Sequence, residues 1–128
     1  MASHFDNLSA VLRQFDFAAG VAVDSDGSIL AQVGDLATKG CTDLVSAVLG
    51  PYGDARATFE SLEGQILPRM SSQGEWFAII DKPGDSFMVV FFGKGLSGVA
   101  LYHLSKRVST AIGERWTAAC GSGPGQQV

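Results

Sequence analysis

The segment with the clearest chemical signature is the run Gly93-Lys94-Gly95-Leu96-Ser97-Gly98. Its glycines fit the pattern G-x-G-x-x-G, in which backbone amides approach a pyrophosphate at the amino end of a helix. A dinucleotide fold also needs a parallel strand after that helix, and this strand carries an acidic residue. Here Glu114 falls within the expected helix, and the chain then continues into Cys120 and a Gly-rich end. We therefore interpret the run as a flexible strand-to-helix turn and expect no nucleotide cofactor.

A second candidate, Asp24-Ser25-Asp26-Gly27, resembles the beginning of a calcium-binding loop. Such a loop spans about twelve residues and closes on a bidentate Glu. Ile29 and Leu30 occupy the positions through which that loop would run, and the later ligands are missing. Asp-Gly between two apolar runs instead predicts a hairpin, because glycine adopts the positive φ that the turn requires. We expect a turn here and no metal.

Cys41 is the candidate nucleophile, with His4 or His103 as its base. A thiol beside the start of a helix can be activated, but nothing in the spacing orders a nucleophile, a base and a third group. His103 falls within a helical pattern, where a surface histidine is expected. Two histidines also provide no metal-ligand spacing. We therefore predict no catalytic residue and no metal site, and a small enzyme that uses Cys41 is the least favoured alternative.

Composition excludes further classes of protein. Aromatic side chains near two expected strands could stack on nucleobases, but 9 Lys and Arg face 13 Asp and Glu, and the net charge of -4 disfavours nucleic acid. We interpret these aromatic residues as core: Trp76, Phe77, Phe87, Phe91 and Phe92. No run approaches the ~18 apolar residues of a membrane span. Two cysteines make no disulfide framework, and no secretory signal is visible, so we expect a cytoplasmic protein.

Apolar residues recurring at spacings of three and four predict four helical segments. They cover residues 5–15, 42–49, 54–62 and 96–116. Gly50-Pro51 separates the two middle segments, because proline lacks a backbone donor and clashes with the preceding turn. The positions expected to face water are Asp6, Asn7, Arg13 and Gln14 in the first helix, and Lys106, Arg107 and Arg115 in the last.

Five further segments are predicted to be strands: residues 17–23, 28–33, 65–71, 75–80 and 87–92. Pro68 restricts the third strand to a sheet edge, because proline cannot donate to a strand ladder. The last two strands are apolar at successive positions, so elements must cover both of their faces. In the fifth, Phe87, Val89 and Phe91 share one face, whereas Met88, Val90 and Phe92 share the other. Between these two strands, Pro83-Gly84 predicts a type II turn.

The order helix-strand-strand-helix-strand-strand-strand-helix indicates an α+β protein. Its simplest closed form is an α/β sandwich, with a five-stranded antiparallel sheet and helices on both faces. We expect one domain over residues 1–118 and a flexible Gly-rich tail over 119–128. The chain is 46% hydrophobic and only 17% charged, against about 25% charged residues in typical domains. This is more apolar surface than one small core needs, and the remainder predicts a partner.

This order resembles the roadblock / dynein light chain domain family. The resemblance is carried by the hairpin Gly20–Leu30 and by the strand pair Trp76–Phe92 that leads into the last helix, and it covers roughly residues 5–116. Gly50-Pro51-Tyr52-Gly53 departs from it by interrupting what is usually one long second helix. The resemblance implies a profilin-like architecture and a noncatalytic homodimer paired through the second helix and third strand. It also implies a regulator or scaffold that acts with Ras-like small GTPases, or an adaptor in motor and signalling complexes.

A self-association surface is therefore expected on the second helix and the third strand, where an edge strand offers free backbone groups. The residues predicted to form it are Val45, Val48, Leu49, Ile66, Leu67 and Met70. The expected partners are a second copy and, by resemblance, a Ras-like small GTPase or signalling protein. The alternative function is a small-molecule sensor of the profilin-like or GAF-like kind, with a ligand held between sheet and helices.

Overall fold

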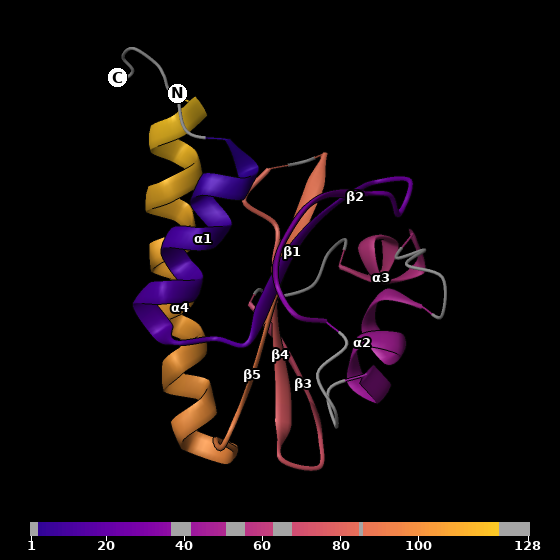
Figure 1. The fold of residues 1–128 in the computed structure, drawn as a ribbon, viewed down its shortest axis with the longest axis vertical. Coiled ribbons are helices and arrows are strands. Elements are labelled where there is room, and N and C mark those ends of the chain that lie inside the picture. The colour runs from indigo at the N-terminus through magenta and orange to yellow at the C-terminus, as the bar shows by residue number, and fades with distance from the viewer. Residues whose placement is uncertain (1–2, 37–41, 51–55, 63–67, 85, 121–128) are drawn as a thin grey trace.

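The computed structural model describes residues 3–36, 42–50, 56–62, 68–84 and 86–120, with side chains as far as residue 116. Its elements are α1 (His4–Phe15), β1 (Ala19–Asp24), β2 (Ile29–Gly34), α2 (Thr42–Leu49), α3 (Arg56–Ser61), β3 (Arg69–Gln73), β4 (Trp76–Asp81), β5 (Phe87–Lys94) and α4 (Gly98–Cys120). The five strands form one sheet in the order β2-β1-β5-β4-β3, and every neighbouring pair is antiparallel. Helices α1 and α4 cover one face, and α2 and α3 cover the other (Figure 1). The predicted α+β sandwich is confirmed.

Helix α1 begins with a capping box. The Ser3 hydroxyl accepts a hydrogen bond from the Asp6 amide at 3.1 Å, and the Asp6 carboxylate accepts one from the Ser3 amide at 3.4 Å. The helix buries Leu8 and Val11 completely. The prediction that Asn7 faces water was wrong, since Asn7 is only 3% exposed. It lies four residues before Val11, so both residues project from the same helix face.

The hairpin between β1 and β2 turns as predicted. Asp24 Oδ1 accepts hydrogen bonds from the amides of Asp26 at 3.0 Å and Ser28 at 2.9 Å, and Gly27 adopts a φ of 91°. The carboxylate of Asp24 is therefore occupied by the turn itself. The register between the two strands shifts at Ala22/Val23, which marks a β-bulge in this pair.

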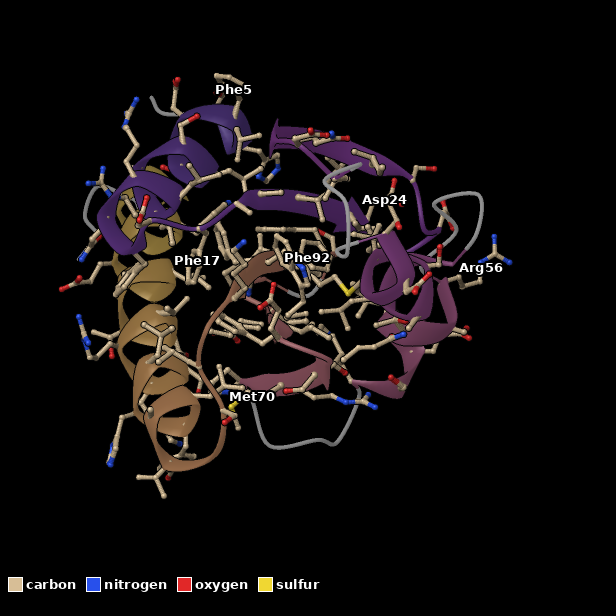
Figure 2. All side chains as sticks on the ribbon, turned by 60° about the horizontal axis from the view of Figure 1, so that its bottom comes forward. Phe5, Phe17, Asp24, Arg56, Met70 and Phe92 are labelled. Atoms are coloured by element: carbon tan, nitrogen blue, oxygen red, sulfur yellow. The ribbon has the colours of Figure 1, made fainter. Side chains whose placement is uncertain are left out.

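The two predicted faces of β5 are confirmed. Met88, Val90 and Phe92 belong to the core beneath α2 and α3, whereas Val89 and Phe91 belong to the core beneath α1 and α4. Figure 2 shows Phe17 on the side of α4 and Phe92 deeper in the sandwich. The aromatic residues predicted to be core are 5% exposed or less, except for the half-buried Phe87. Two-sided burial of the central strands thus accounts for much of the apolar surplus.

Strand β3 lies at the edge of the sheet, as predicted, and pairs with β4 from Arg69, opposite Ile80, to Gln73. Residues 65–67 of the predicted strand lie outside the described residues. Pro68 directly precedes Arg69, and a proline cannot donate to the ladder, so the strand begins after it. The predicted break between two helical segments is confirmed, because α2 ends at Leu49 and α3 begins at Arg56.

The predicted type II turn between β4 and β5 was wrong. Gly84 does not adopt the positive φ that the third position of that turn requires. A Cβ at Gly84 would lie 2.9 Å from Cε1 of Phe87. A side chain at this position would therefore force the half-buried Phe87 ring to shift.

Helix α4 continues to Cys120, two residues past the predicted end of the domain, and residues 121–128 lie outside the described part. Its charged residues Lys106, Arg107 and Arg115 are exposed, as expected. Near its carboxyl end, Trp116 Nε1 donates a hydrogen bond to His4 Nδ1 at 3.0 Å, which ties α4 to the start of α1. Among the described residues, no helix combines the length and the apolar content that crossing a bilayer requires.

Candidate interaction surface

The edge formed by β3 is open to a partner strand. Alternate amides and carbonyls of an edge strand point away from the sheet, and no other described strand lies beyond β3. Its register with β4 runs without a shift from Arg69 to Gln73. Ser72 and Gln73 are exposed, and Met70 and Ser71 are half-buried. The strand is therefore regular, solvent-accessible and able to pair.

On the side of α2 and α3, a groove of about 190 Å³ borders this edge. Its lining is made mostly of small side chains: Ala47, Val48, Ala57, Thr58, Ser61, Arg69, Ser71 and Ile80. Arg69 Nη1 donates a hydrogen bond to Ser61 Oγ at 2.8 Å, so the first residue of β3 is tied to the end of α3. Thr58 Oγ1 donates to the carbonyl of Val48, which joins α3 to α2 across the break between them. Small lining residues allow the backbone of a partner to approach closely.

On the opposite face, Met70 connects β3 to helix α4. Met70 packs against the core cluster that contains Leu101 and Val108 of α4. Figure 2 shows it at the rim of the molecule, between the sheet edge and this helix. The β3 edge is thus flanked on both faces, by the groove on one side and by Met70 and α4 on the other.

The six residues predicted to form a self-association surface lie in different environments. Val48 and Leu49 are 4% and 1% exposed, because the apolar stripe of α2 packs onto the sheet. Their side chains pack in the core of the subunit, although Val48 also lines the groove beside β3. Val45 and Met70 are half-buried and reach the surface. Ile66 and Leu67 lie outside the described residues.

Sequence reasoning missed Ala47, Arg69 and Ser71, which line the groove. The apolar spacing of Leu44, Val45, Val48 and Leu49 identifies one stripe, but it does not say whether that stripe faces the core or a partner. Helix geometry could have identified Ala47. It directly precedes the core position Val48, and successive residues of a helix point in different directions, so Ala47 is turned toward solvent.

No protein-family model and no curated protein matches this sequence. Solved structures do match it. A gliding protein MglB from Thermus thermophilus has a TM-score of 0.53 at 17% identity, over 90% of this chain and 93% of that chain. An MglB described with a tetrameric arrangement has a TM-score of 0.52 at 17% identity, over 85% and 84% of the two chains. Myxococcus xanthus MglB has a TM-score of 0.51 at 16% identity, over 89% and 98%.

The chain has the roadblock fold of MglB. This confirms the predicted architecture over most of both chains. At this level of identity the likeness concerns the fold.

Within the roadblock fold, each glycine of the G-x-G-x-x-G run has a local structural role. A Cβ at Gly93 would lie 2.7 Å from Cζ of Phe77, so this glycine makes room for an aromatic ring. Gly95 and Gly98 adopt φ values of 93° and 58° in open space, where they shape the turn into α4. All described strand pairs are antiparallel, so the run is not part of a parallel strand-helix-strand unit. The interpretation as a strand-to-helix turn is confirmed.

The two candidate histidines lie at different ends of α4. His4 contacts Trp116 near one end of α4, whereas His103 is exposed near the other end. Trp116 lies thirteen helical positions after His103, a distance of about 20 Å along the axis. Cys41 lies outside the described residues. The described part of the chain contains no group of three or more His, Cys, Asp and Glu that could hold a metal ion.

Proposed function

We propose that this protein is a noncatalytic, self-associating binding module that acts with a Ras-like small GTPase, or within a signalling or motility complex. The observation that carries the proposal is the β3 edge, which is regular over its whole length and flanked on both faces. The likeness of fold to MglB, one example of which is described as a gliding protein, supports the same interpretation. A Ras-like partner would place the protein in the cytoplasm, as expected from the sequence.

Self-association would extend the sheet from one subunit into the next across β3. Each subunit would contribute the half-buried side chains Val45 and Met70 and the small residues beside the groove. A stable interface of this kind buries about 800 Å² per subunit. The MglB described with a tetrameric arrangement supports self-association in proteins of this fold.

The alternative function, a small-molecule sensor, has less support. It requires a ligand pocket between the sheet and its helices. In this region side chains such as Phe91, Phe92 and Ile79 are completely buried and fill the two layers. The groove beside β3 is open at the surface, which suits a protein partner better than an enclosed ligand.

The GTPase partner is tested directly with purified proteins. Each Ras-like small GTPase encoded in the source genome is loaded either with GDP or with a non-hydrolysable GTP analogue, and its binding is measured by titration calorimetry. We expect one of them to bind at least tenfold more tightly in one nucleotide state, because a regulator must distinguish the two states. Absence of binding by every GTPase in both states would contradict the proposed partner.

A further inference from the structure

The two flanks of helix α4 face different parts of the molecule. The Arg107 guanidinium lies 5.6 Å from the ring of Phe15 in α1, so one flank faces α1. On the other flank, Ser109 Oγ donates a hydrogen bond to Asp81 Oδ2 of β4 at 2.7 Å. Tyr102 precedes Ser109 by seven residues, or about two helical turns, and therefore lies on the same flank as Ser109. This flank faces the β4–β3 side of the sheet.

Exposed apolar side chains gather at the amino-terminal end of this helix. Val99 is 71% exposed, Tyr102 47% and Leu96 39%. Lys106 Nζ lies 5.3 Å from the centre of the Tyr102 ring, so a cation borders the apolar surface. We call these four residues the Tyr102 strip. In Figure 1 the amino-terminal part of α4 extends below the end of α1, so α1 does not cover this part of the helix.

The strip lies beside the proposed self-association edge. Helix α4 contacts β3, and Met70 of β3 packs into the same core as Leu101 of α4. At the start of the helix, the amide of Gly95 donates to the carbonyl of Glu75 in the β3–β4 turn at 3.0 Å. An apolar surface of this exposure beside a pairing edge is typical of a docking site.

Charge indicates which partner fits the strip. The charged member of the strip is Lys106, whereas Arg107 lies on the flank that faces α1. A second copy of the strip would offer Lys106 another lysine and no carboxylate with which to pair. An anionic membrane is recognised by clusters of about four to eight Lys and Arg, whereas this strip has a single lysine. A protein segment with both carboxylates and apolar side chains complements it best.

We infer that the Tyr102 strip docks an acidic amphipathic segment of a partner protein. The apolar side of that segment covers Val99 and Tyr102, and one of its carboxylates pairs with Lys106. Aromatic residues at the centre of an interface contribute strongly to binding, so Tyr102 is the expected anchor. This inference deepens the proposed function, since it describes the partner of a surface adjacent to the proposed dimer edge.

The experiment is a titration followed by nuclear magnetic resonance. The full chain labelled with ¹⁵N is mixed with a synthetic helical peptide that has Leu on one face and Glu on the other, and with its twin in which Lys replaces Glu. We expect amide shifts centred on residues 96–106 and at least tenfold tighter binding of the Glu peptide. Shifts centred elsewhere, no shifts up to millimolar peptide, or equal binding of both peptides would overturn the inference.

Three variants make the test specific. Lys106→Glu and Tyr102→Ala are each expected to weaken binding of the Glu peptide at least tenfold, while Arg115→Glu, an equal charge change farther along α4, changes it less than twofold. Both strip positions are exposed, so the variants should fold, which the unperturbed spectrum checks. Light scattering of the same samples reports self-association separately, so loss of peptide binding with an unchanged mass concerns the strip alone. Binding of phosphatidylserine vesicles with the same dependence on Lys106 would identify a membrane as the occupant and overturn the inference.

Discussion

The two edges of the sheet differ in regularity, although their strands are of similar length. At one edge, β2 contains a register shift against β1, ends at a glycine with a φ of 76°, and lies beneath α1. At the other, β3 pairs with β4 over five successive residues without a shift. Bulges twist an edge away from regular pairing and so protect it from association. Of the two edges that the described strands form, the β3 edge is therefore the one suited to pairing.

The largest loss of stability is expected from substitution of the glycines that follow or end the two edge strands. A Cβ at Gly34 would lie 2.2 Å from the carbonyl oxygen of Ala18, at a φ of 76°, whereas Gly74 in the β3–β4 turn has a φ of 62° with open space around it. We expect Gly34→Ala to lower the free energy of unfolding by about 3 kcal/mol, from strain and backbone overlap combined. Gly74→Ala should lower it by about 1 kcal/mol, from strain alone. Urea denaturation measures both, and equal losses would contradict the difference in packing.

A smaller loss of stability is expected from substitutions in the two hairpin turns. Asp24 accepts two backbone hydrogen bonds at the turn into β2, while the turn into β4 consists of Gly74, with a φ of 62°, and the exposed Glu75. We expect Asp24→Ala to destabilise the protein by about 1 kcal/mol, because exposed hydrogen bonds contribute modestly. Asp24→Asn keeps an acceptor oxygen and should cost less than half of that. Glu75→Ala serves as the control in thermal unfolding, and a loss there as large as that of Asp24→Ala would show that the two turns are not held differently.

Local signals in the sequence predict much of this fold. Asp24 and Gly27 specify the first hairpin through turn chemistry, and the unbroken apolar run of β5 requires cover on both faces. Pro68 correctly indicates an edge strand, because its effect depends on a missing donor in the backbone. These features depend on residues adjacent in the chain or on the alternation of side chains along one strand. They can therefore be predicted without the tertiary structure.

The remaining features depend on contacts between distant segments. Val48 and Leu49 form an apolar stripe that serves equally well for a core or an interface, and only the position of the sheet decides between them. The ring of Phe87 packs directly against Gly84, a contact that its position in a turn does not reveal. The Tyr102 strip also escaped prediction, since its exposure follows from where α1 ends beside α4. Periodicity alone therefore does not determine which way an apolar stripe faces, which residues pack in close contact, or which surface a neighbouring helix covers.

The most direct test of the central claim is the mass in solution at micromolar concentration, measured by light scattering. We expect the wild type to have twice the 13.4 kDa mass of one chain. Ser72→Lys on the exposed surface of β3 should shift the protein toward the monomer, raising the dissociation constant at least tenfold, about 1.4 kcal/mol. Gln32→Lys on the exposed surface of β2 should leave the dimer unchanged. A wild-type monomer, or a dimer disrupted by Gln32→Lys and not by Ser72→Lys, would contradict pairing through β3.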